Sequence, residues 1–239
     1  MANKIVVVLS GGLDSSVAAY RTKYEFPHSE LHLLSFNYGQ KHVKELRAAK
    51  RIANYLNAFH QVVELSNLGL LFKESKSSLI SSTDVPDGHY AEETMKATVV
   101  PNRNMIMASI AAGYAVSIGA DKLVFGVHGG DHFIYPDCRT AFFTSLQATI
   151  LEGNEGFVDS NFTVYTPYIA NTKNDIALDA FRLRVPIQAT WSCYKGGEIH
   201  CGTCGTCVER LEAIASTGIE DPTEYQNNEY WKKVTTTKE

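Results

Sequence analysis

The chain contains no run of apolar residues close to the roughly 20 that a membrane-spanning helix requires. Its first residues, MANKIVVVLSGG, lack the basic start, the longer apolar segment and the cleavage site of a signal peptide. Basic residues are not in excess either, because the formal net charge is -4, which does not favour general binding to nucleic acid. These absences predict a cytoplasmic protein that binds neither a membrane nor nucleic acid directly.

Two common nucleotide-binding signatures are also absent. No glycine-rich turn is followed by the Lys-Ser or Lys-Thr of a P-loop, and there is no G-x-G-x-x-G dinucleotide fingerprint. The sequence has no internal repeat and no heptad pattern. A length of 239 residues is enough for one α/β domain with a small appendage, or for two small domains.

What the sequence does contain is an alternation of short apolar runs with stretches of helical apolar spacing. Strands are expected near residues 6–9, 31–39, 60–65, 122–127 and 162–169, and helices after residue 12 and near residues 43–57, 102–119, 140–151 and 174–185. This alternation predicts a Rossmann-like parallel sheet with helices on both faces, which binds ligands at the carboxyl ends of its strands. The polar segment 66–98 is interpreted either as a mobile flap or as a passive long loop.

The first predicted strand leads directly into a glycine-rich turn. Val6–Leu9 is an apolar run too short for a helix, and Ser10-Gly11-Gly12 separates it from a helix start. Glycines allow the backbone to approach a bound group closely, and the amides at a helix N-terminus attract an anion. The pattern therefore predicts a phosphate site, with an ordinary strand–turn–helix as the alternative.

The sequence SGGLDSS resembles the pyrophosphate-binding loop of the N-type ATP pyrophosphatases, whose fold is adenine nucleotide alpha hydrolase-like. These enzymes use ATP to adenylate a carbonyl or carboxylate oxygen. The resemblance implies that Asp14 lies beside the pyrophosphate or its Mg²⁺. It also implies that the pyrophosphate end of ATP is held by Leu9, Ser10, Gly11, Gly12, Ser15 and Ser16.

Four of the five cysteines crowd into one short segment with the spacing C-x7-C-x2-C-x2-C. In a reducing compartment such a pattern indicates metal binding rather than disulfides. Four thiolates suit tetrahedral Zn²⁺ at about 2.3 Å, and an iron–sulfur cluster is the main rival. The predicted ligands are Cys193, Cys201, Cys204 and Cys207.

Four further stretches, together with the cysteine cluster, point to one family. They are FNYGQKH (36–42), VVPNRNMIM (99–107), GVHGGDHFIYPDCR (126–139) and TPYIANTKNDI (166–176). Their content and order resemble the 7-cyano-7-deazaguanine (preQ0) synthases, and the resemblance extends from Leu9 to Ile214.

This resemblance implies an ATP-dependent carbon–nitrogen ligase. Such an enzyme converts 7-carboxy-7-deazaguanine, ammonia and ATP into the nitrile through adenylated carboxylate and amide intermediates, on the way to queuosine or archaeosine. It further implies an ATP-binding α/β domain, here residues 1–188, a small helical zinc-binding region, here residues 189–239, and a homodimer.

The implied chemistry needs groups that hold phosphate, bind Mg²⁺ and stabilise developing charge, rather than a nucleophile. We expect Arg103 and Lys173 to supply the cations, because each lies in a family-like motif at a predicted helix start. The alternative for both residues is an exposed charged side chain with no role in the reaction. Asp14 completes the predicted catalytic set.

For the deazaguanine ring, an aspartate could accept from the amino and imino groups, an arginine could pair with the carboxylate and a tyrosine could stack. Asp131 and Asp137 are not both needed. The candidates are Tyr38, His128, Asp131, Tyr135, Asp137 and Arg139.

The chain departs from the family pattern at Leu13, where glutamine is common, at Asn102, where glycine is common, and in a shorter first gap of the cysteine cluster. Asparagine tolerates left-handed backbone, although less freely than glycine. Two other functions remain open: a tRNA-modifying adenylating enzyme such as a thiolase, and a non-catalytic zinc-containing interaction module.

Overall fold

A parallel β-sheet forms the centre of the molecule. The computed structural model describes residues 3–40, 43–72, 74, 77–81, 83–91, 93–130 and 134–235. Within these residues, the sheet has five strands in the order β3-β2-β1-β4-β5, and every neighbouring pair is parallel. The strands are β1 (Lys4–Val8), β2 (Glu30–Asn37), β3 (Phe59–Glu64), β4 (Lys122–Val124) and β5 (Thr163–Tyr165).

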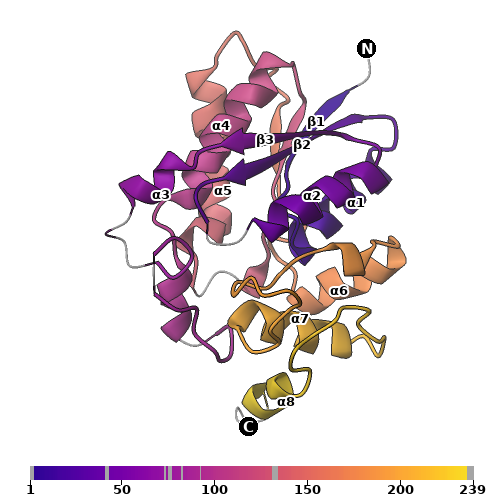
Figure 1. Cartoon of the computed structure of the whole chain (residues 1–239). Coiled ribbons are helices and arrows are strands. Elements are labelled where there is room, and N and C mark those ends of the chain that lie inside the picture. Colours follow the sequence, from indigo (N-terminus) through magenta and orange to yellow (C-terminus); the bar gives the residue numbers. More distant parts are fainter. Residues whose placement is uncertain are drawn as a thin grey trace.

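Helices follow the strands along the chain and cover the sheet (Figure 1). The α-helices are α1 (Leu13–Glu25), α2 (Lys44–Tyr55), α3 (Asn67–Leu71), α4 (Arg103–Ser117), α5 (Thr140–Gly153), α6 (Lys173–Arg182), α7 (Gly205–Ala215) and α8 (Tyr230–Thr235). Short 3-10 helices lie between them in the described part of the chain, among them η2 (Glu93–Thr98), η4 (Pro136–Cys138) and η5 (Ile187–Ala189).

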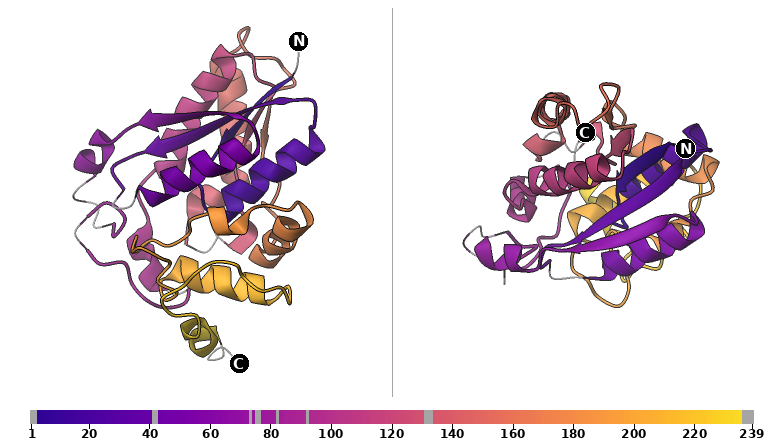
Figure 2. Two further views of the ribbon diagram at one scale, coloured as in Figure 1. Left: turned by 45° about the vertical axis from the view of Figure 1, so that its right-hand side comes forward. Right: turned by 90° about the horizontal axis from the view of Figure 1, so that it is seen from above.

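The strands are apolar on both faces because helices cover both. Along β1, Val6 packs into the core beneath α4 and α5, whereas Ile5 and Val7 face the core beneath α1 and α2. This alternation follows from the two-residue period of a strand. Figures 1 and 2 show the two helical layers on either side of the sheet. The predicted Rossmann-like fold with helices on both faces is therefore confirmed.

A third core lies below the carboxyl end of the sheet. It joins α1 to α6 and α7 through buried residues such as Val17, Ile176 and Ile214. The C-terminal helices α7 and α8 lie at this end of the molecule (Figure 1). The division into residues 1–188 and 189–239 remains a prediction. None of the helices in the described part of the chain is long and apolar enough to cross a membrane.

The strands and helices predicted from periodicity agree with the structure, with boundaries displaced by a few residues at most. Asn102, at the position where glycine is common in the family that the sequence resembles, is the N-cap of α4 and has a left-handed backbone with φ of 57°. Asparagine is one of the few side chains that adopts this conformation readily, so the departure is tolerated.

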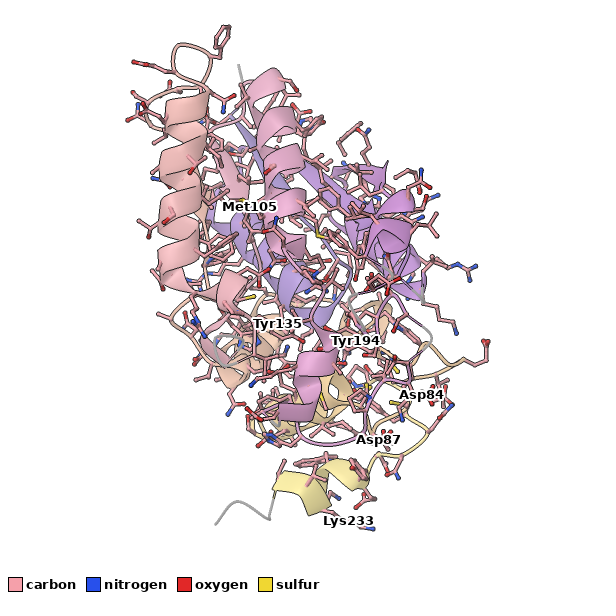
Figure 3. The ribbon with its side chains drawn as sticks, turned by 90° about the vertical axis from the view of Figure 1, so that its left-hand side faces the viewer. Asp84, Asp87, Met105, Tyr135, Tyr194 and Lys233 are labelled. Atoms are coloured by element: carbon pink, nitrogen blue, oxygen red, sulfur yellow. The ribbon has the colours of Figure 1, made fainter. Side chains whose placement is uncertain are left out.

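The polar segment 66–98 contacts the C-terminal part of the chain. Asp87 forms an isolated antiparallel bridge with Cys204 and an ion pair with Lys195 at 2.5 Å. Asp87 is labelled at this end of the molecule in Figure 3. The backbone N–H of Gly88 also donates to the carbonyl of Thr203. The described part of this segment is therefore held to the cysteine-rich region by several contacts.

Candidate active site

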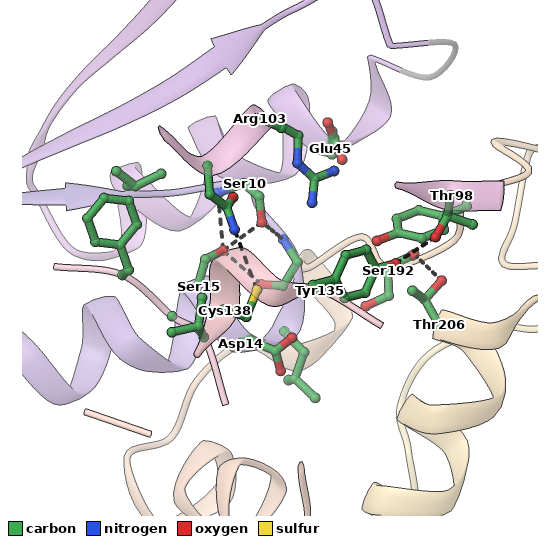
Figure 4. Close-up of a pocket in the computed structure, with 18 of the residues that line it drawn as sticks. Ser10, Asp14, Ser15, Glu45, Thr98, Arg103, Tyr135, Cys138, Ser192 and Thr206 are labelled. Atoms are coloured by element: carbon green, nitrogen blue, oxygen red, sulfur yellow. Dashed lines mark hydrogen bonds between the residues drawn. The ribbon is translucent and has the colours of Figure 1, made fainter. Parts of the chain in front are cut away.

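A cavity of about 250 Å³ opens at the carboxyl ends of β1 and β4 (Figure 4). Strand β1 lies between β2 and β4, so the chain leaves in opposite directions on the two sides of this point. Open α/β sheets bind ligands at such a switch point. The lining combines the loops after β1, β2 and β4 with the first turns of α2, α4, α6 and α7. Segment 66–98 also supplies Tyr90, Met95 and Thr98, so it forms a wall of the cavity.

The loop after β1 is closed by its own serine side chains. The backbone N–H of Ser10 donates to Ser15 Oγ at 3.1 Å, and the two hydroxyls lie 2.9 Å apart. Ser16 Oγ donates to the Gly12 carbonyl at 2.6 Å. Helix α1 begins directly after Gly12, and no side chain caps it. Its first amides are therefore available to an anion, and the phosphate site itself remains a prediction.

The predicted loop residues divide into two groups. Leu9, Ser10, Gly12, Asp14 and Ser15 line the cavity. Gly11 and Ser16 lie behind the surface and shape the loop, because Ser16 is fully buried and Gly11 packs against the backbone of α2.

Gly11→Ala should destabilise the protein by at least about 2 kcal/mol. The φ of Gly11 is +85°, and an added Cβ would clash with the Glu45 carbonyl oxygen and lie 2.6 Å from the Ala49 nitrogen. Gly12 has a φ of -73°, and its added Cβ would come no closer than 3.4 Å to another group. Gly12→Ala is thus the matched control, which should stay folded with nearly unchanged stability. Denaturant unfolding measures the free energy of unfolding of both variants. Equal stability of the two would contradict this account of the loop.

An ion-pair network lies beside the loop. Lys173 Nζ is 2.7 Å from Asp14 Oδ2 and 3.0 Å from Glu209 Oε2, while His128 Nε2 is 3.6 Å from Glu209 Oε1. Burial raises the pKa of the Asp14 carboxyl, but attraction to Lys173, and less strongly to His128 and Arg210, outweighs burial and holds that pKa below its usual value. Asp14 is therefore ionised near neutral pH and presents a carboxylate to the cavity.

The other end of the cavity is aromatic. The Arg103 guanidinium carbon lies 6.0 Å from the centre of the Tyr38 ring, and Tyr135 Oη is 2.6 Å from Thr98 Oγ1. Burial lowers the pKa of Arg103, but interactions with Tyr38, Tyr194 and Tyr135 offset this and raise it, so the guanidinium stays charged. Burial also raises the pKa of Tyr38 to about 12, which keeps its phenol protonated. Figure 3 labels Tyr135 and Tyr194 at neighbouring positions.

Three other predicted substrate residues lie away from the cavity surface. The described lining includes neither Asp137 nor Arg139. The Asp137 carboxylate accepts from the Asn104 backbone N–H at 3.3 Å, and Arg139 is exposed just before α5. His128 is fully buried, beside Glu209. Asp131 falls outside the described residues. The assignment of these four to the substrate remains a prediction.

The four clustered cysteines converge on one point and could hold a metal ion. All are buried, and their sulfur atoms lie within 4.8 Å of one another. Cys201 Sγ accepts backbone N–H groups from Thr203 at 3.4 Å and Cys204 at 3.3 Å, and such bonds stabilise a thiolate. Four buried thiols with these partners suit a tetrahedral metal ion. No disulfide joins any of them within the described structure.

Helix α7 connects this cysteine cluster to the cavity. It begins at Gly205, directly after Cys204, and contains Cys207 in its first turn. Thr206 and Glu209 of the same helix line the cavity. The sequence patterns did not identify Glu209, because a glutamate after a cysteine cluster is typical of an exposed helix face. The tertiary structure shows instead that Glu209 is buried and pairs with Lys173.

Comparison with known proteins identifies the family. Residues 4–218 match the family model described as "Queuosine biosynthesis protein QueC". The chain belongs to the QueC family. The curated 7-cyano-7-deazaguanine synthases of Brucella anthropi and Sinorhizobium fredii are each 50% identical to it, over 96% and 97% of this chain respectively and 96% of each relative.

A solved structure supports the fold of this QueC-family chain. NMN synthetase from Francisella tularensis superposes with a TM-score of 0.51 at 15% identity, covering 97% of this chain and 84% of that protein. At this level of identity the likeness concerns the fold alone, and it agrees with the predicted Rossmann-like parallel sheet.

Proposed function

We propose that this chain converts 7-carboxy-7-deazaguanine, ammonia and ATP into 7-cyano-7-deazaguanine. The near full-length similarity to curated synthases supports the reaction. The observation that carries the chemistry is the position of Lys173, which pairs with Asp14 at the amino end of α1, next to a loop whose amides are available to phosphate. This arrangement suits adenylate transfer with loss of pyrophosphate.

The reaction needs two activations. A carboxylate does not accept ammonia directly, because its leaving group would be oxide. Adenylation of that oxygen creates a good leaving group, ammonia displaces AMP to give the amide, and a second activation at the amide oxygen leads to the nitrile. In this proposal the loop of residues 10–16 binds the pyrophosphate end of ATP, and Lys173 and Arg103 stabilise developing negative charge.

Two metal ions belong to the proposal. Mg²⁺, which neutralises phosphate charge, would be held at Asp14, whose carboxylate is ionised and lines the cavity. Zn²⁺ would be held by the four clustered cysteines in a structural role, since their sulfur atoms supply a complete tetrahedral donor set. A homodimer, a cytoplasmic location and the lack of direct contact with nucleic acid complete the proposal. They rest on the family resemblance and on the composition.

The direct test mixes the purified protein with ATP, Mg²⁺, ammonium and 7-carboxy-7-deazaguanine. Mass spectrometry should detect the nitrile, and AMP and pyrophosphate should accumulate with it. Omission of ATP or of ammonium is the control, and either should abolish the product. Nucleotide hydrolysis without nitrile in the complete mixture would reject the proposal.

Two arginine variants decide where the substrate carboxylate is bound. Arg103→Ala should weaken binding of 7-carboxy-7-deazaguanine roughly thirtyfold, because it removes a charged partner from a partly dry site. Arg139→Ala should bind as the unaltered protein does, because Arg139 is exposed and outside the described lining. Calorimetric titration of 7-carboxy-7-deazaguanine, and separately of ATP, measures the affinities of both variants. A loss confined to the Arg139 variant would instead favour the assignment made from the sequence.

A further inference from the structure

One acidic side chain in the cavity takes no part in the reaction described above. Glu45 lies in the first turn of α2 and lines the cavity. Figure 4 shows it beside Arg103, across Ser10 and Ser15 from Asp14. Arg103 is also close enough to lower the pKa of Glu45. Glu45 therefore belongs to the aromatic end of the cavity, whereas Asp14 and Lys173 belong to the phosphate end.

A buried glutamine holds the Glu45 carboxylate in place. Gln40 Nε2 donates to Glu45 Oε1 at 2.8 Å and to the Phe36 carbonyl at 3.1 Å, while Gln40 Oε1 accepts from the Tyr38 N–H at 2.8 Å. Gln40 is only 8% exposed, so these bonds fix its amide and hence the carboxylate. Among the described residues, no other hydrogen bond to this carboxylate is formed. Oε2, and one remaining lone pair of Oε1, can each accept from a ligand.

Burial also disfavours the ionised form of Glu45. Burial raises the pKa of Glu45 to about 7, although the Gln40 hydrogen bond and Arg103 act to lower it. A ligand that donates two N–H groups would stabilise the ionised form and repay part of the burial cost.

The chemistry of this end selects among the possible ligands. A carboxylate repels the phosphates of ATP, and the nearby Arg103 guanidinium repels a divalent cation. A flat, uncharged ring with N–H donors is repelled neither by the carboxylate nor by the guanidinium. Tyr38, Tyr135 and Tyr194 line the same end and supply aromatic faces for such a ring.

We propose that the Glu45 carboxylate binds the donor edge of the guanine-type ring of the substrate, accepting from the ring imino N–H and from the exocyclic amino group. The identity of this ring rests on the proposed function. Two adjacent donors match the two oxygens of one carboxylate in the same way as a bidentate guanidinium does. An adenine edge presents one donor beside an acceptor, whose lone pair would face the carboxylate. Glu45 thus directs the deazaguanine, rather than the adenine of ATP, to the aromatic end.

The test combines a variant with a pair of ligands. Glu45→Gln is compared with Glu152→Gln, a matched change at an exposed position on α5. The ligands are 7-carboxy-7-deazaguanine and the same compound without its exocyclic amino group, and ATP is titrated separately. The unaltered protein and the Glu152 variant should bind the amino compound at least about tenfold more tightly than its analogue. Glu45→Gln should bind the amino compound roughly thirtyfold more weakly, lose this preference and keep its ATP affinity.

Three results would overturn the inference. They are the absence of any preference in the unaltered protein, an unchanged deazaguanine affinity in Glu45→Gln, and a loss in that variant confined to ATP, which would place Glu45 at the nucleotide. The first of these needs no variant, so the test does not depend on the folding of Glu45→Gln. Nitrile formation by the unaltered protein tests the proposed function independently. If no nitrile forms but the Glu45-dependent preference is present, only the proposed function fails.

Discussion

Asp14→Asn should lower kcat/KM for nitrile formation by at least about a hundredfold while leaving the fold intact. Asparagine keeps the shape of the side chain but removes the charge that pairs with Lys173 at 2.7 Å and that would hold Mg²⁺. The fold should survive because Lys173 keeps its second partner, Glu209, at 3.0 Å. Steady-state kinetics with varied ATP measures the loss, and a thermal melt checks the fold.

Asp84→Asn is the matched control for this experiment. Asp84 is exposed and does not line the cavity as described, so its variant should retain full activity. Normal turnover by a well-folded Asp14→Asn protein would remove Asp14 from the mechanism. A loss of activity that merely follows a loss of folded protein would assign Asp14 a structural role instead.

Cys204→Ser should remove the bound metal and lower the free energy of unfolding by about 3 kcal/mol or more. Cys204 is fully buried among the other three cysteines, and serine cannot replace a thiolate in a tetrahedral sulfur site. Because α7 starts directly after Cys204 and carries Glu209, loss of the metal should also disturb the partner of Lys173. Residual folded protein should therefore show weaker catalysis.

The fifth cysteine provides the control. Cys138 is buried and lines the cavity, and it is not a member of the four-cysteine cluster. Cys138→Ser should therefore keep a full complement of metal, measured by elemental analysis. The unaltered protein should contain about one zinc per chain and be colourless. Iron with sulfide, or active protein without metal, would contradict the zinc assignment.

Local sequence patterns were sufficient for most of the fold. The apolar runs at β1 and β2 are buried on both faces, which requires helices on both sides, and the helical stretches between them provide these helices. The left-handed Asn102 could also be anticipated, because backbone preference is a property of a single residue. The predicted ends of the fourth and fifth strands lie too far along the chain, since β4 ends at Val124 and β5 at Tyr165, before their apolar runs end.

The candidate site was predictable where one short segment carries the chemistry. The SGGLDSS loop and the four cysteines are local motifs, and the structure places the loop at the cavity and brings the cysteine sulfur atoms together. The pattern could not decide which side chains around Cys138 face the cavity. Asp137 and Arg139 are adjacent in sequence to the cavity-lining Cys138, and the described cavity wall includes neither, so their assignment to the substrate remains a prediction.

The sequence by itself determined the parallel sheet, the glycine-rich loop that lines the cavity, the cysteines that converge and the family resemblance. All of these depend on periodicity or on spacing within a few residues. The tertiary structure alone decided that Glu209, Lys173 and Asp14 form one network and that Glu45 lies at the aromatic end beside Arg103. Such contacts join helices far apart in the chain, and they depend on how α2, α4, α6 and α7 pack around the end of the sheet. No local pattern encodes that packing, because it results from the burial of apolar faces over the whole molecule.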